Sequence, residues 1–435
     1  MPASRKRRRS EPGPSDRVLR STAKKRRAEI ASANSFLDMT VAIKLFSVLS
    51  AWQPRGRLVL ELNASSPSDS EHWFKDHTQN DEDDCIHDPA STRRHDDPDH
   101  GWDKGRQVKP PPAMAITRVF PLLCEGVFGP RSIARVCAIT GLVIRRQLRY
   151  RVDLGLLHSM CKKLPRLENL AYEPRLNGYI QDMPEVDDPE HVTRAEDMSK
   201  ILPNIKTLRT VSIFEDFNQQ FALALHNAET GILRDLVIVN PVPNKLLAQA
   251  FIATGHGLEH LSIAFIFDAG DFFDSLLRLP EWLNNGTPFL QDDSVLQFPT
   301  WPHLQSLTLT SSTLTQTTLP EKISKLLRSA SSVALKIPKL QSMVLWFGKV
   351  GEACAVTFRR NKAARKASLT WRGTWHFTFT EDVIESWLKV TFDRDLGYPY
   401  LTVKHERIRG VDVRCLGDAI YHLRLPERVI HPVSL

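Results

Sequence analysis

The residues with the clearest capacity for chemistry form a histidine- and aspartate-rich group within positions 68–112. From Asp69 to Asp103 the chain has twelve acids, three Lys or Arg and five histidines. Imidazole and carboxylate groups bind divalent cations when a rigid frame holds them. This polar segment buries too little apolar surface to offset its ordering entropy, which predicts a disordered surface insertion and no metal site. The group comprises His87, Asp88, His95, Asp96, Asp97, Asp99 and His100.

No other spacing in the chain is typical of an active site. G-x-S-x-G, H-E-x-x-H, Walker A and protein-kinase signatures are all missing from the sequence. Gly255-His256-Gly257 is the nearest approach to a glycine-rich loop, and a turn before a strand explains it better. None of the fifteen histidines is paired in a motif with a nucleophile or an orienting acid. The sequence therefore predicts a protein that is not an enzyme and has no cofactor.

The cysteines do not form metal-ligand pairs. Their spacings are wide and no Cys-x-x-Cys pair occurs, whereas a structural zinc site needs close pairs. Buried free thiols in a reducing compartment are the favoured interpretation. The six residues are Cys85, Cys124, Cys137, Cys161, Cys354 and Cys415.

A basic N-terminal tail carries the whole net charge. Residues 1–30 hold eleven Lys or Arg and three acids, which accounts for the net charge of +8. We expect a disordered tail over residues 1–34, with two basic clusters that predict a nuclear-import signal. A solvated tail without an address is the alternative. The clusters are Arg5, Lys6, Arg7, Arg8, Arg9 and Lys24, Lys25, Arg26, Arg27.

The clusters favour a nuclear over a cytoplasmic location. They also leave open a second function, nucleic-acid association through the tail. The chain has no run of about 18 apolar residues, so no membrane span is expected.

A recurring apolar pattern predicts the elements that would position any site. Apolar residues at relative positions 1, 4 and 6 suit a strand that follows a turn. Helix-compatible stretches separate the units, at residues 154–163, 218–227, 245–253, 271–279 and 321–329. We therefore expect an α/β fold, an irregular leucine-rich-repeat-like βα solenoid with a mainly parallel sheet. An ordinary α/β domain with chance matches is the alternative. The units start at Ile139, Leu167, Leu208, Leu233, Leu258, Leu304 and Leu340, and four follow Pro165, Pro203, Pro302 or Pro338.

The predicted organisation has five parts. The disordered tail (1–34) precedes a helix and a strand that pack on the array (35–67). The acidic insertion (68–112) precedes the array itself (113–365), and a β-rich region (366–435) caps it. In the cap, residues 368–371, 376–379 and 401–403 are predicted strands, and residues 381–389 a helix.

Alternate strand residues predict a surface for a protein partner. Those between the inward apolar positions are small, hydroxylated or apolar, without a charge cluster, which disfavours phosphate-rich ligands. Phe214 and Trp346 are candidate anchors, and the alternative is that both pack under a cap or loop. The candidate partner-binding residues are Glu173, Phe214, Asp235, His260 and Trp346.

Four segments resemble a family of filamentous-fungal proteins that join an F-box to a leucine-rich-repeat-like C-terminal region. They lie at residues 51–64, 68–74, 144–147 and 164–174. The resemblance implies a protein-protein interaction platform, similar to the substrate-binding region of F-box proteins in SCF ubiquitin ligases. The Leu-Pro start of an F-box is missing at Ala28-Glu29-Ile30-Ala31-Ser32, which argues against docking on a Skp1-type adaptor.

Overall fold

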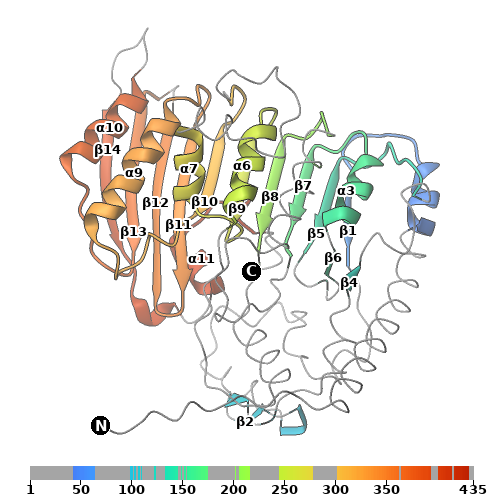
Figure 1. The fold of residues 1–435 in the computed structure, drawn as a ribbon, viewed down its shortest axis with the longest axis horizontal. Helices are drawn as coiled ribbons and strands as arrows, with labels where there is room; N and C mark the ends of the chain where they lie inside the picture. The colour runs from blue at the N-terminus through green and yellow to red at the C-terminus, as the bar shows by residue number, and fades with distance from the viewer. Residues whose placement is uncertain are drawn as a thin grey trace, which may run out of the picture.

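The computed structural model of this chain describes only part of its sequence. The described residues are 43–63, 98–100, 102–103, 106–107, 109, 122–123, 133–145, 148, 151–152, 154–174, 201, 205–215, 244–277, 301–361, 364–392, 400–413 and 416–430. They form an α/β fold around an open sheet of ten strands (Figure 1). Every statement below about the structure concerns these residues.

Neighbouring strands of the large sheet follow one another in chain order. The order is β1-β5-β7-β8-β9-β10-β11-β12-β13-β14, and all pairs from β1 to β11 are parallel. The prediction of a mainly parallel sheet is confirmed. The parallel strands are β1 (Val59–Leu62), β5 (Gly141–Ile144), β7 (Asn169–Tyr172), β8 (Thr210–Phe214), β9 (His260–Ala264), β10 (Ser306–Thr310) and β11 (Ser342–Lys349).

Six of the seven predicted units contain these strands, from β5 to β11. The unit at 233–238 lies outside the described residues. One backbone hydrogen bond recurs at the second residue of successive units. Arg209 donates its N–H to the carbonyl of Glu168 at 2.9 Å, and Glu259 donates to Arg209 at 2.8 Å. Gln305 and Gln341 continue the series at 2.7 and 2.8 Å. Because equivalent backbone groups satisfy one another, units of different length enter the sheet in the same register.

Helices cover one face of the sheet (Figure 1). Contacts join α6 to α7, α7 to α9, and α9 to α10, so this layer is continuous over the C-terminal half. The helices predicted from apolar spacing are all present where they are described. They are α3 (Leu154–Lys162), α6 (Lys245–Thr254), α7 (Ala269–Leu277), α9 (Pro320–Ala334) and α10 (Glu381–Thr391), and residues 43–50 are also helical.

Local chemistry fixes the ends of these helices. Asn244 caps α6, its side-chain oxygen accepting the N–H of Leu247 at 3.0 Å. Proline occupies the first turn of α9, where its missing N–H costs nothing. Gly255 ends α6 in the predicted turn before β9, and a Cβ there would lie 2.8 Å from the Phe251 carbonyl oxygen.

The C-terminal region extends the sheet. β12 (Glu352–Asn361) is antiparallel to β11 and to β13 (Lys366–Gly373), while β13 is parallel to β14 (Tyr400–Arg407). The predicted strands at 368–371 and 401–403 lie in β13 and β14. The predicted strand at 376–379 is wrong, because this segment is irregular. Its aromatic residues pack on β13 instead, with the ring of Phe377 stacked on Trp371 at 4.5 Å.

Smaller elements complete the described structure. Two separate pairs of short strands are β2 (Trp102–Asp103) with β3 (Arg106–Gln107), and β4 (Leu122–Leu123) with β6 (Arg151–Val152). The 3-10 helices are η4 (Pro98–His100) and η7 (Gly410–Asp412), and α11 (Leu416–Leu423) is the last helix. None of the described helices is long and apolar enough to cross a membrane.

Candidate binding face of the sheet

Alternate residues along each strand divide the sheet into two chemically different faces. The ring of Phe358 in β12 packs on Trp387 of α10 with centroids 4.7 Å apart, which marks the helix face. Side chains one position away point to the opposite face, called here the open face. Register therefore assigns Ser342 of β11 and Arg359 of β12, which are paired, to the open face.

The C-terminal segment of the chain covers part of the open face. α11 packs on β11 and β12, and Gly348 allows the approach, because a Cβ there would lie 2.7 Å from the Cβ of Ala419. Beyond α11, the hydroxyl of Ser212 in β8 donates to the Arg428 carbonyl at 2.7 Å. Val429 and Ile430 are buried. Residues 416–430 thus run from β12 towards β8, and we name them the C-terminal cover.

The two predicted anchors lie inside the core and do not reach the surface. Phe214 and Trp346 both have 0% exposure. Phe265 packs edge-on against both, with centroids 5.7 Å from Phe214 and 5.3 Å from Trp346. The expectation that these aromatics are exposed to a partner is corrected, and the alternative of packing beneath a cap describes them. Their apolar rings are removed from water by the chain's own folding.

The other predicted partner-binding residues do not form one exposed surface either. Glu173 is buried, His260 is half-buried in β9, and Asp235 lies outside the described residues. Burial lowers the pKa of His260, the positive charge of Arg428 in the C-terminal cover lowers it further, and Glu259 opposes both effects. His260 is therefore influenced by the cover that lies over this half of the sheet.

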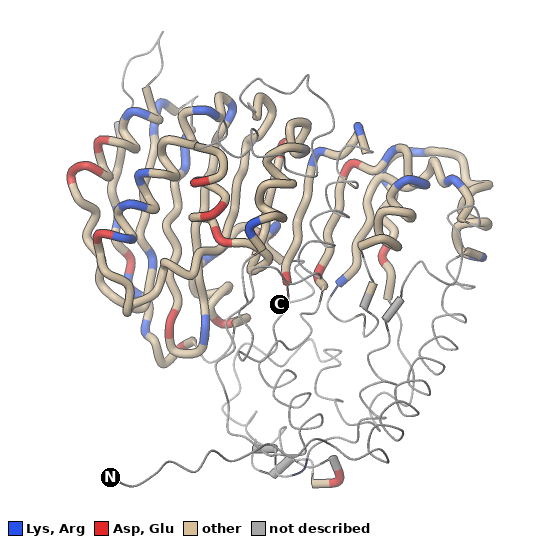
Figure 2. The backbone as a smooth tube through the Cα atoms, in the orientation of Figure 1, with Lys and Arg blue, Asp and Glu red and all other residues tan. Residues whose placement is uncertain are grey.

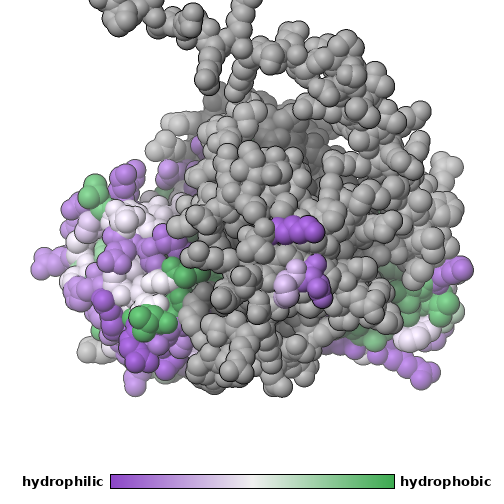
Figure 3. Space-filling view, turned by 90° about the horizontal axis from the view of Figure 1, so that it is seen from below, coloured by the Kyte–Doolittle hydropathy of each residue, from purple (hydrophilic) through white to green (hydrophobic). Residues whose placement is uncertain are grey.

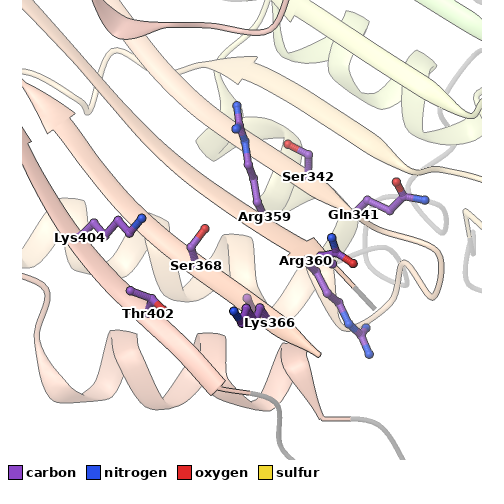
Figure 4. A pocket seen from close by; sticks show the side chains of 10 residues that line it. Gln341, Ser342, Arg359, Arg360, Lys366, Ser368, Thr402 and Lys404 are labelled. Carbon is purple, nitrogen blue, oxygen red and sulfur yellow. The ribbon is translucent and has the colours of Figure 1, made fainter. Parts of the chain in front are cut away.

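An uncovered groove lies on the open face of β11–β14. It has a volume of about 450 Å³ and is open to solvent. Figure 4 shows side chains from four neighbouring strands projecting into or around it. The lining residues are Gln341, Ser342, Arg359, Arg360, Asn361, Lys366, Ala367, Ser368, Thr402 and Lys404. We name this region the basic groove, because four of these side chains are cationic and none is acidic.

Three of the cations have no acidic partner among the residues that the structure describes. Arg359, Lys366 and Lys404 are exposed and make no ion pair with a described residue. Figure 2 shows Lys and Arg, together with Asp and Glu, along the backbone at the β14 end of the sheet. The strand face was expected to lack a charge cluster. That prediction considered strands up to β11, whereas β12–β14 continue the same face and supply these cations.

An ion pair lies beyond the groove, on the side of the C-terminal cover. Arg372 of β13 pairs with Glu406 of β14. The Arg372 Nε–H also donates to the carbonyl of His422 in α11 at 2.5 Å. The paired Arg372 and Glu406 and the basic groove lie on the same two strands, β13 and β14. A ligand would therefore meet unpaired positive charge in the groove and not at this ion pair.

Apolar side chains do not form a broad alternative surface on the side seen in Figure 3. On the described part of that view, small apolar patches are separated by hydrophilic side chains. Among the exposed apolar residues, Val350 lies in a turn, Val411 in η7 and Tyr421 in α11. The basic groove is therefore the better candidate for a specific site.

The remaining sequence-derived candidates provide no site in the described structure. Asp99 and His100 belong to η4, and the rest of the metal-like group is outside the described residues, as is the basic tail with both import clusters. No metal-ligand cluster occurs among the described residues. The predicted free thiols are confirmed at Cys137, Cys161 and Cys354, of which the last two are buried.

The fold and the groove together define a class of protein. It is an α/β protein in which an open, mostly parallel sheet presents a basic groove on the face opposite its main helix layer. Residues 201–431, more than half of the chain, match the model described as a family of unknown function (DUF6546), and the chain belongs to this family. The matched segment contains β8–β14, the C-terminal cover up to Ile430, and every residue of the basic groove. Among curated proteins, none matches this chain.

Proposed function

We propose that this chain is a non-enzymatic protein-interaction platform whose docking site is the basic groove. The carrying observation is the set of three unpaired cations on an accessible sheet face. An acidic segment of a partner protein would supply the charge that Arg359, Lys366 and Lys404 lack. Electrostatic complementarity of this kind selects a partner and speeds its association.

The repeated architecture supports this proposal. Six units share the same strand position, the same hydrogen bond between second residues, and sequential strand order. We interpret them as an irregular leucine-rich-repeat-like array, in which stacking of units buries what one unit cannot bury alone. Such arrays present extended surfaces that bind proteins, as the resemblance to F-box proteins with leucine-rich repeats also implies.

The test is capture of partners from the native cell by the full chain and by two charge-matched variants. The groove variant is R359E/K366E/K404E. The control is K322E/K325E/K389E, which reverses three exposed cations on α9 and α10 of the helix face. We expect a discrete protein that the wild type and the control retain and the groove variant loses.

The partner must also dock through an acidic stretch. Crosslinking from a photoreactive residue at Thr402, compared with one at Lys325, should locate that stretch. A partner retained by the groove variant would show that docking occurs elsewhere, and failure to enrich any protein would contradict the platform itself. Recovery of a Skp1-type adaptor with a cullin would extend the proposal to ubiquitin ligation.

A further inference from the structure

One row of polar side chains crosses the basic groove at a single register. Ser342 pairs with Arg359, Arg359 with Ser368, and Ser368 with Thr402. Since neighbouring strands are about 4.8 Å apart, the row spans roughly 15 Å across β11–β14. All four side chains lie on the open face, and Figure 4 shows them around one hollow.

Two lysines flank this row. Lys366 lies two residues before Ser368 on β13, and Lys404 lies two residues after Thr402 on β14. With Arg359 on β12, the three cations surround the hydroxyl of Ser368 on different strands. This places a focus of positive charge near the centre of the row.

The hydroxyls of the row are unused by the fold. Those of Ser342, Ser368 and Thr402 make no hydrogen bond within the described structure, whereas those of Thr310 and Ser212 in the same sheet do. Thr310, for example, accepts the N–H of Phe265 at 2.7 Å, and Ser212 donates to Arg428. The row therefore offers three O–H donors beside a guanidinium that can donate two parallel bonds.

We infer that the central part of the row, Arg359, Ser368 and Thr402, binds a phosphoryl group carried by the partner's acidic segment. The inference rests on the proposed function and specifies its ligand. A phosphorylated side chain carries a charge of about −1.5 to −2 and three acceptor oxygens, whereas a carboxylate has one charge and two oxygens. Three cations and the neighbouring hydroxyls of Ser368 and Thr402 match the former.

The composition of the groove favours a protein as the source of the phosphoryl group. No lining residue is aromatic, so nucleic-acid bases would find no surface on which to stack. Ala367 is the single apolar residue in the lining, and it is buried. Lipid chains would therefore find no exposed apolar surface in the groove. The hollow of about 450 Å³ is large enough for a phosphorylated side chain with adjoining backbone.

The first experiment repeats the partner capture after treating the cell extract with a phosphatase that is then inactivated. Loss of the partner from wild-type chain supports the inference. Capture that persists after treatment, yet still fails with R359E/K366E/K404E, would overturn the inference while leaving the proposed function intact. The two proposals are thereby separated.

The second experiment uses a labelled acidic peptide with phosphoserine, glutamate or serine at one central position, measured by fluorescence anisotropy with the full chain. We expect phosphoserine to bind about tenfold more tightly than glutamate, the factor that one extra hydrogen bond to a charged group supplies. Ser368→Ala and Arg359→Gln should remove that preference, and Lys325→Gln on the helix face should keep it.

Both groove residues point to the solvent-accessible side, and circular dichroism melting verifies that the variants are folded. Equal affinity for phosphoserine and glutamate would contradict the inference. The inference would also be contradicted by displacement of the phosphopeptide at a lower concentration of a competitor than of inorganic phosphate. The two competitors are a single-stranded oligonucleotide and a vesicle of phosphatidylserine and phosphatidylcholine.

Discussion

The open face has a covered half over β8–β11 and an uncovered half over β11–β14, and the two halves use their side chains in opposite ways. Over β8–β11 the C-terminal cover buries apolar rings and engages the Ser212 hydroxyl. At the start of β11, β13 and β14, hydroxyls and cations remain without protein partners in the described structure. Burial on one half stabilises the fold, and unsatisfied polar groups on the other half remain available to a ligand.

The largest expected effect of this contrast is on stability, at the buried residue Trp346 of the covered half. Trp346→Ala should lower the free energy of unfolding by about 3–5 kcal/mol, because it leaves a cavity under the cover. Urea denaturation measures the change. The matched control is Trp52→Ala, since Trp52 is 52% exposed. Equal effects of the two substitutions would mean that Trp346 is not buried in solution.

A smaller change in the free energy of unfolding should distinguish the Ser212 hydroxyl, which is hydrogen-bonded to the cover, from the Ser342 hydroxyl in the groove. Ser212→Ala removes the 2.7 Å bond to the Arg428 carbonyl and should cost about 0.5–1.5 kcal/mol. Ser342→Ala removes a hydroxyl that makes no hydrogen bond in the described structure, so the free energy of unfolding should change very little. A reversed order of the two losses, measured by urea denaturation, would contradict the assignment of the halves.

The smallest effect concerns the protonation of His260 beneath the cover. Its pKa is lowered, so the unfolded chain takes up this proton before the folded chain does. The contribution of His260 to stability is therefore complete above its ordinary value of 6.5 and is lost as pH falls through the lowered pKa of the folded state. His260→Gln should reduce the loss of stability between pH 7 and pH 5.

Arg428→Gln tests the cause of that lowering. Removal of this charge should move the pKa of His260 upwards in an NMR titration. The internal control is His405, whose pKa is lowered by burial and by His376 and should not respond. If His260 titrates identically in both proteins, the cover does not lie over β9 in solution.

Strands whose signal is local were predicted well from sequence. In the units at Leu258 and Leu304, two apolar residues spaced by two define a strand face, and the preceding turn sets its start. The helix predicted at residues 321–329 from apolar spacing is likewise present, within α9. These features depend on neighbours within a few residues, so the sequence alone contains them.

The hairpin between β11 and β12 was missed, although a signal was present. Val350-Gly351 forms a two-residue turn between Lys349 and Glu352, and Gly351 has a φ of +76°, which glycine adopts without strain. Alternation follows in Ala353-Cys354-Ala355-Val356. Reading this turn would have joined β12 to the sheet and placed Arg359 on the open face.

The sequence by itself determined the parallel strands from β5 to β11, most helices, the basic tail and the absence of recognised catalytic motifs. The tertiary structure decided which half of the open face is accessible. Ser342, Arg359, Ser368 and Thr402 form one row only because three strand pairings share a register. Arg428 reaches Ser212 across 216 residues of sequence. Both arrangements arise from backbone pairing and burial between distant segments, which local spacing does not encode.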